Sequence, residues 1–144
     1  MGGPLGDSGG RAAVDAPSAK ATPDPRRRLG ALGEEIAASH LMRSGYAILA
    51  RNFRTRWGEL DIVATNGDTL VFCEVKTRRV NRDGRDPLES VHARKQLQLR
   101  RMAGQWLAQS GPRRRMGAYR FDAIGITLDA DDRLLRLDHL EAAF

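Results

Sequence analysis

Three charged side chains interrupt the apolar runs between residues 58 and 79, and their types suit metal-dependent chemistry. Asp61 lies in the run Leu-Asp-Ile-Val-Ala, and Glu74 and Lys76 lie in Leu-Val-Phe-Cys-Glu-Val-Lys. Residues two apart on a strand share a face, so Glu74 and Lys76 should project side by side. Two neighbouring carboxylates on a half-buried sheet repel each other unless a cation lies between them. A hard divalent cation with oxygen ligands is the expected occupant, and Lys76 adds a fixed positive charge.

The turn signal at residues 66–68 separates the two runs and predicts a β-hairpin. A two-residue loop places Asp61 diagonal to Glu74. A four-residue loop pairs Thr65 with Leu70 and places Asp61 directly opposite Glu74. Both registers put the carboxylates on one face, with Cβ atoms about 5 to 8 Å apart, whereas a three-residue loop puts them on opposite faces.

A purely structural explanation remains open for the same residues. All three could lie on a solvated edge strand, with Glu74 and Lys76 as a same-face ion pair. Cys73, the only cysteine, falls on the opposite strand face, which favours packing over a nucleophilic role. A single cysteine excludes an internal disulfide and fits a reducing cytosol, so a cytoplasmic location is expected.

Composition favours one basic globular domain. The chain has 144 residues, of which 41% are apolar and 29% charged, enough for a single core. Lys and Arg number 24 against 18 acids, giving a net charge of +6 and a pI near 10.4. Such a balance is consistent with a polyanionic partner, nucleic acid first. The apolar runs are too short to span a bilayer and the start lacks a secretion signal, so no membrane partner is expected.

The elements that must position these residues follow from periodicity and turn signals. Residues 1–28 are expected to form a disordered leader that ends in the basic run 26–28, and residues 29–144 a single domain. We predict helices at 29–44 and 87–109, and strands at 46–54, 119–128 and 134–140 besides the hairpin. The chain is therefore expected to be an α/β protein, with a central mixed sheet of about five strands, an antiparallel hairpin at its core, and flanking helices.

Both helices offer further candidates. Glu34 and Glu35 lie early in the first helix, where acids favour the helix dipole, and periodicity does not decide which one reaches the sheet. Lys95 shares a column with apolar residues of the second helix, so it either snorkels to the edge or points into a polar site. His92 and His139 are predicted to be isolated. Asp122 is interpreted as a polar residue of a strand end.

A helix with an early Glu, a strand Asp, and Glu-x-Lys on the next strand resembles the restriction-endonuclease-like nuclease superfamily, the PD-(D/E)XK fold. Here the motif is Asp61 followed by Glu74-Val75-Lys76. The proline that commonly precedes the Asp is absent, and Leu60 takes its place.

The resemblance narrows to one family. GEEIAASHL, GYAILARNFR, GELDIVA and LVFCEVKTR, in that order, are similar to the YraN-like family of uncharacterised bacterial proteins. The resemblance covers residues 29–144 and favours Glu34 over Glu35, because the family motif pairs Gly33 with Glu34. The family is similar in layout to archaeal Holliday junction resolvases, which cut branched DNA.

The resemblance implies hydrolysis of phosphodiester bonds, in branched or otherwise structured DNA rather than RNA, by an endonuclease that uses Mg²⁺ or Mn²⁺. Asp61, Glu74 and the Val75 carbonyl would hold the metal, with Glu34 reaching it through a water molecule. Lys76 would orient the attacking water or neutralise the phosphate. Further phosphate contacts would come from four basic residues: Lys95, Arg56, Arg78 and Arg79. Enzymes that cut two strands are often dimers, so the resemblance is compatible with a homodimer, although the sequence does not give the oligomeric state. The alternative is a non-catalytic nucleic-acid-binding module on a nuclease fold.

Overall fold

A computed structural model describes residues 24–80, 93–110 and 117–144. The predicted order of helix, three strands, helix and two strands is confirmed. The elements are α1 (Pro25–Arg43), β1 (Ala47–Thr55), β2 (Gly58–Thr65), β3 (Thr69–Arg79), α2 (Ala93–Ser110), β4 (Ala118–Leu128) and β5 (Leu134–Leu140).

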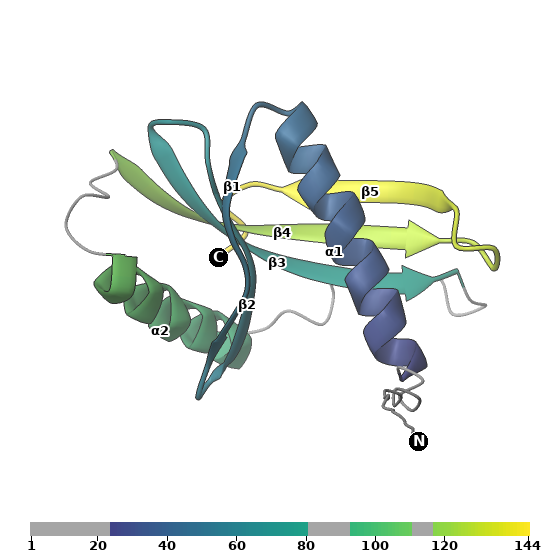
Figure 1. Ribbon diagram of the computed structural model, residues 1–144, viewed down its shortest axis with the longest axis horizontal. Coiled ribbons are helices and arrows are strands. Elements are labelled where there is room, and N and C mark those ends of the chain that lie inside the picture. Colours follow the sequence, from purple (N-terminus) through teal and green to yellow (C-terminus); the bar gives the residue numbers. More distant parts are fainter. Residues whose placement is uncertain (1–23, 81–92, 111–116) are drawn as a thin grey trace, which may run out of the picture.

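The strands form one mixed sheet in the order β1-β2-β3-β4-β5 (Figure 1). Strands β3 and β4 are parallel, and the other neighbouring pairs are antiparallel. Parallel neighbours need a crossover connection, and the segment that contains α2 provides it. The predicted α/β class, with a mixed sheet around an antiparallel hairpin, is therefore confirmed.

The two helices cover opposite faces of the sheet (Figure 1). Helix α1 crosses β3 and its neighbours, and α2 packs on β1 and β2. One buried cluster lies under α1: Ala37, Ala38, Leu41, Ile62, Ala64, Val71, Cys73, Ile124, Ile126 and Leu128. The other lies under α2: Leu60, Val63, Leu70, Phe72, Leu99, Met102, Ala103 and Trp106. Because alternate residues of β3 enter different clusters, both faces of this strand are buried.

Helix α1 begins at Pro25, earlier than the predicted start at residue 29. Asp24 is the N-cap, and its carboxylate accepts a hydrogen bond from the Arg26 amide at 3.0 Å. Proline at the first helical position suits this start, since its missing N–H has no helical partner. The basic run 26–28 thus lies in the helix, so the end of the leader predicted for residues 1–28 is wrong, and residues 1–23 lie outside the described residues.

Helix α1 approaches β3 closely at Gly33. A Cβ atom added at this glycine would lie 1.7 Å from Thr77 Oγ1 and 2.7 Å from Thr77 Cβ. Rotation of the threonine side chain cannot relieve the second clash, because the Cβ atom does not move with χ1. The glycine therefore allows the contact between helix and strand that brings the next residue, Glu34, toward the sheet.

The hairpin of β2 and β3 has the four-residue loop. Thr65 pairs with Leu70, and the ladder runs on to Ile62 and Cys73. Asn66 closes the loop, because its side-chain oxygen accepts from the Thr69 amide at 3.0 Å. The two-residue alternative is therefore wrong, and the next residues along the hairpin, Asp61 and Glu74, face each other.

Helix α2 is described from Ala93 onward, so its predicted start at residue 87, together with Val91 and His92, lies outside the described residues. Its predicted apolar stripe is confirmed. Leu99, Met102, Ala103 and Trp106 are buried, and Leu107 packs against them.

Candidate active site

Asp61 lies where the ladder between β2 and β3 ends. Its Oδ2 accepts a hydrogen bond from the backbone amide of Val75 at 2.8 Å. Burial, followed by the charge of Glu74 and then that of Glu34, raises the pKa of Asp61 to about 8, although the Val75 hydrogen bond acts in the opposite direction. Without a cation, Asp61 therefore tends to hold a proton at neutral pH.

Glu74 is 3% exposed and binds its charged neighbours through one oxygen. Its Oε1 lies 3.4 Å from Lys95 Nζ and 3.5 Å from Lys76 Nζ. Its Oε2 is buried and accepts no hydrogen bond from the part of the chain that the structure describes. Buried carboxylate oxygens normally have partners. Asp61 can supply one only when protonated, so this carboxylate pair is arranged to hold either a proton or a cation.

Glu34 faces this pair from α1, whereas Glu35 does not. Glu34 is half-buried, and burial, with the charge of Glu59 adding, raises its pKa; a side-chain hydrogen bond with Asp61 opposes this shift. Glu35 is exposed and pairs with Arg51 at 2.9 Å. Periodicity left open which of these two acids reaches the sheet, and the structure places Glu34 on the side of the site.

Asn52 is a site residue that the sequence did not reveal. With its amide nitrogen turned toward α1, it donates to Glu34 Oε2 at 3.0 Å. Its backbone is left-handed, with φ of 54°, a conformation that asparagine adopts more readily than most residues. Residue type was the one available signal, since nothing in the strand pattern marks this position.

The predicted basic residues separate into two groups. Lys76 and Lys95 both reach Glu74, so Lys95 points into the polar site rather than away from it. The three arginines are not brought to the acids. Arg56 stacks on Trp57 at 4.6 Å, Arg79 pairs with Asp132 at 2.7 Å, and Arg78 Nε is buried without a partner among the described residues.

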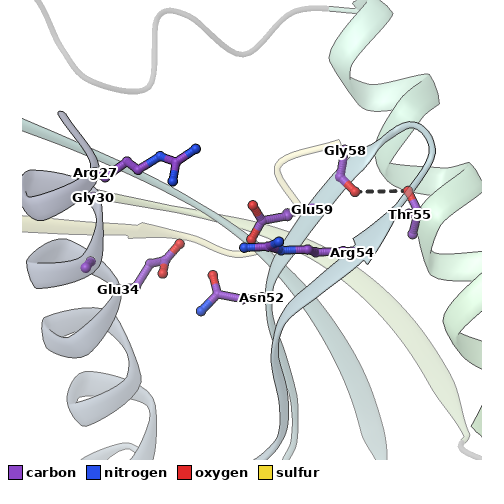
Figure 2. A pocket seen from close by; sticks show the side chains of 9 residues that line it. Arg27, Gly30, Glu34, Asn52, Arg54, Thr55, Gly58 and Glu59 are labelled. Atoms are coloured by element: carbon purple, nitrogen blue, oxygen red, sulfur yellow. Dashed lines mark hydrogen bonds between the residues drawn. The ribbon is translucent and has the colours of Figure 1, made fainter. Parts of the chain in front are cut away.

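A cleft of about 630 Å³ opens beside Glu34, between α1 and the β1–β2 hairpin (Figure 2). Arg27 and Glu34 line it from the helix, and Asn52, Arg54 and Glu59 from the strands. The sequence could have revealed Arg27: once the helix starts at Pro25, Arg27 and Glu34 lie two turns apart on one face. The cleft therefore presents both basic and acidic groups around Glu34, whereas Asp61 and Glu74 are not among its lining residues.

The described residues can form only a small metal site. Within ranges 24–80, 93–110 and 117–144, no group of three or more His, Cys, Asp or Glu side chains is close enough to bind a metal ion. Two carboxylates and the Val75 carbonyl remain as the oxygen set, with Glu34 further away. Mg²⁺ often uses one or two carboxylates and completes its shell with water and substrate phosphates. The unpartnered Glu74 oxygen fits such an ion.

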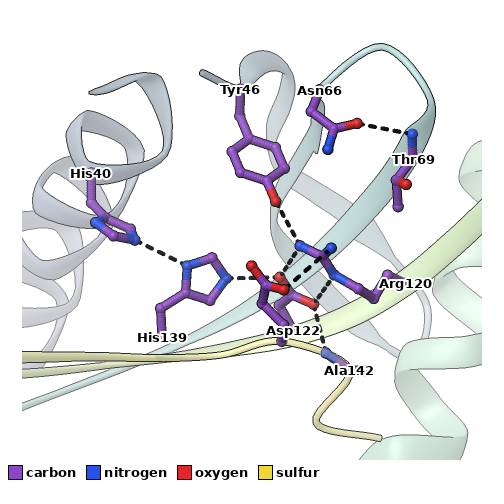
Figure 3. A network of polar contacts seen from close by, with 9 residues as sticks. His40, Tyr46, Asn66, Thr69, Arg120, Asp122, His139 and Ala142 are labelled. Atoms are coloured by element: carbon purple, nitrogen blue, oxygen red, sulfur yellow. Dashed lines mark hydrogen bonds and ion pairs between the residues drawn. The ribbon is translucent and has the colours of Figure 1, made fainter. Parts of the chain in front are cut away.

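A second polar cluster surrounds Asp122, which is fully buried in β4 (Figure 3). Arg120 Nε and His139 Nε2 lie 2.8 and 2.7 Å from its two oxygens, and the Ala142 amide donates at 3.0 Å. His40 of α1 contacts His139 at 3.0 Å. Burial disfavours the charged carboxylate, but these hydrogen bonds outweigh it and lower the pKa of Asp122. The predictions of an isolated His139 and a strand-end Asp122 are therefore wrong.

Cys73 lies buried beneath α1, and burial raises the pKa of its thiol. This position agrees with the predicted packing role.

None of the described helices has the length and apolar character needed to cross a membrane.

Taken together, the geometry defines an α/β protein whose mixed sheet carries a paired-carboxylate and lysine site at the open end of its central hairpin. Residues 33–126 match Uncharacterised protein family UPF0102, and the chain belongs to this family. This confirms the family-level resemblance drawn from the four motifs.

Curated relatives span nearly the same length. The UPF0102 protein of Moorella thermoacetica is 44% identical over 119 residues, which cover 83% of this chain and 97% of the relative. A UPF0102 protein of Parafrankia sp. is 45% identical over 118 residues, covering 82% and 97%. The one from Acidothermus cellulolyticus is 48% identical over 119 residues, covering 77% and 89%.

Proposed function

We propose that this protein is a metal-dependent endonuclease that hydrolyses phosphodiester bonds in DNA. The observation that carries the proposal is the buried Oε2 of Glu74, a neighbour of Asp61, for which the described residues form no hydrogen bond unless Asp61 is protonated. A carboxylate pair with an open oxygen and two adjacent lysines matches the chemistry of phosphate hydrolysis better than that of a structural ion pair. The resemblance to the PD-(D/E)XK superfamily supports the same reaction class.

The residues have separate roles in this proposal. Asp61, Glu74 and the Val75 carbonyl would hold Mg²⁺ or Mn²⁺. When bound, the ion supplies positive charge against the phosphate and acidifies water at the site. The side chain of Lys76 is partly exposed beside Glu74, so its ammonium group can orient the attacking water or neutralise a phosphate oxygen. Glu34 borders the cleft and can accept a hydrogen bond from that water.

Basic residues would position the nucleic acid. Arg27 and Arg54 line the cleft beside the acids, and the whole chain carries a net charge of +6. Phosphate contacts position DNA without reading its sequence, so recognition should depend on shape and weaken steeply with salt. The similarity in layout to archaeal Holliday junction resolvases favours branched or otherwise structured DNA, although similar folds can host different activities.

The test is a cleavage assay on branched, linear and single-stranded DNA with Mg²⁺ or Mn²⁺. We expect cleavage of at least one substrate, and a loss of about 100-fold or more for Asp61→Asn, Glu74→Gln and Lys76→Met. Glu35→Gln is the matched control, because this acid lies next to Glu34 but outside the site. Absence of cleavage on every substrate, or equal activity of Asp61→Asn and wild type, would contradict the proposal.

A non-catalytic nucleic-acid-binding module is the second candidate. Its supporting observation is that two lysines already neutralise Glu74, in a site where the described residues supply only two close carboxylates. Calorimetric titration with Mn²⁺ separates the candidates. A nuclease should bind Mn²⁺ in wild type and lose that binding in Glu74→Gln. DNA binding without any Mn²⁺ response would favour the module.

A further inference from the structure

The edge strand β5 exposes an unusual amount of apolar surface. Within the described residues it pairs with β4 along one side only. Leu134, Leu135 and Leu140 are 45%, 56% and 50% exposed. Exposed edges usually carry proline, lysine or a bulge that blocks pairing with another chain. This edge has a register shift near Leu134 but neither proline nor lysine. The exposed leucines and the free edge of β5 therefore make this strand a candidate for pairing with another chain.

We propose that β5 pairs with β5 of a second copy of this chain, in antiparallel register about a two-fold axis at Leu137. The argument begins with the faces of the sheet. Opposite residues in an antiparallel pair share a face, and a two-fold axis perpendicular to the sheet keeps each residue on its own face. One residue of β5 must therefore lie beside the axis, directly opposite its own copy in the partner subunit.

Charge selects that residue. An axis through Arg136 would set this arginine opposite its own symmetry mate, and an axis through Asp138 would set two carboxylates opposite each other. Like charges directly opposite destabilise a strand pair. An axis through Leu137 instead sets Arg136 opposite Asp138 of the partner subunit, and the reverse by symmetry. Of the three central positions of β5, Leu137 alone makes the edge complementary to itself.

The stretch 136–140 keeps an unbroken register with β4, whereas the register shifts between Leu134 and Arg136. Leu134 thereby lies on the face of Leu128, opposite to that of Leu140, so the choice of axis rests on the central charges. Arg136 and Asp138 already lie on one face, with Arg136 Nε 3.0 Å from Asp138 Oδ1, so both charges are placed to meet the partner.

This assembly does not depend on the proposed activity. It would join the two five-stranded sheets into one continuous sheet. Because the axis is perpendicular to the sheet, the two carboxylate sites would open toward the same side.

Charge reversal with mixing tests the register. Arg136→Asp and Asp138→Arg are each made as single variants, and the association state of wild type, each variant and their equimolar mixture is measured by analytical ultracentrifugation. We expect wild type to dimerise, each single variant to weaken the dimer at least about tenfold, and the mixture to recover it, because the acidic pair of one variant faces the basic pair of the other.

Circular dichroism and thermal unfolding of each variant exclude misfolding as the cause of dissociation. A monomeric wild type at high micromolar concentration would overturn the proposal. Single variants that dimerise as strongly as wild type would overturn the register, as would a mixture that stays monomeric. Loss of the ion pair within one chain cannot explain recovery in the mixture, since neither variant regains that pair.

Discussion

The carboxylates of Asp61 and Glu74 compete for whatever positive charge enters the site. Two lysines approach Glu74, yet they leave one of its oxygens without a partner. In the metal-free protein Asp61 can hold a proton and donate a hydrogen bond to Glu74, because the pKa of Asp61 is raised to about 8. A bound cation would displace this proton, so metal affinity should increase with pH up to about 8.

The same shift predicts how stability depends on pH. Asp61 has a pKa of about 8 in the folded protein against an ordinary value of 3.8. Between these values the folded state binds more protons than the unfolded state, so wild type without metal should lose stability as pH rises from about 4 to about 8. Asp61→Asn removes this titration and should gain about 1 to 3 kcal/mol relative to wild type across that window.

Urea unfolding with a chelator, at several pH values, measures this difference. Asp68→Asn is the matched control, because Asp68 is exposed in the hairpin loop and should leave the slope unchanged. A constant gap between wild type and Asp61→Asn at all pH values would show that Asp61 titrates normally.

The sequence was informative about single residues where an acid interrupts a buried strand, but it could not separate two kinds of buried acid. Asp61 and Asp122 both interrupt apolar strands. Asp122 is satisfied inside the protein by Arg120 and His139, whereas Asp61 faces another carboxylate. The spacing Arg120-x-Asp122 places both residues on one strand face, as in Glu74-x-Lys76, and was the available signal. The contact with His139 depends on the pairing of β4 with β5.

At the scale of elements, the position of Glu34 depends on how closely α1 can approach β3. Gly33 makes this approach possible, because Thr77 occupies the space that a side chain would need. The family motif Gly33-Glu34 thus has a physical basis: the glycine brings the helix to the strand, and the acid uses that proximity.

Gly33→Ala should separate α1 from β3 and destabilise the protein by about 1 to 3 kcal/mol, as expected for overpacking. Gly30→Ala is the matched control in the same helix, since a Cβ there meets nothing within 4 Å. It should stabilise the protein by up to about 1 kcal/mol through helix propensity. Chemical denaturation of both variants tests the contrast, and equal effects would exclude the close approach.

The sequence predicted the existence of every described element, but it left two details of their ends undecided or wrong. Two hairpin registers were compatible with the alternation of apolar residues. The side chains of Thr65 and Asn66 select the longer loop by bonding to Thr69, which alternation does not report. The start of α1 was misplaced because the segment before Leu29 lacks apolar periodicity, although Asp24 and Pro25 carry the signal of a helix start.

At the scale of the whole molecule, Asp122 connects elements that are distant in sequence. Arg120 donates both to Asp122 and to the Tyr46 hydroxyl before β1, while His139 of β5 links Asp122 to His40 of α1 (Figure 3). Burial, the neighbouring His139 and Arg43 lower the pKa of His40. These contacts join the first helix, two strands and the C-terminal residues at one point.

Asp122→Asn should therefore destabilise the whole fold, by about 3 to 5 kcal/mol, because it leaves Arg120 without its buried counter-ion. Asp132→Asn is the control: its pair with Arg79 is exposed and contributes about 1 kcal/mol or less. Urea denaturation measures both. A small loss in Asp122→Asn would mean that Arg120 finds another partner, such as Glu141.

The mixed sheet, its antiparallel hairpin and the flanking helices followed from the pattern of the chain, because consecutive strands favour antiparallel pairing and an intervening helix allows a crossover. The edge-to-edge complementarity of β5 did not, because it becomes visible only when the outermost strand of the sheet is known.

The hydrogen bond from the Val75 amide to Asp61 has one more consequence. This backbone group reports on a side chain rather than on a neighbouring strand. Its nuclear magnetic resonance signal should therefore move when the carboxylate loses its proton or gains a cation. The amide that holds Asp61 in place is thus a built-in spectroscopic probe, which can follow the site in solution before any substrate is known.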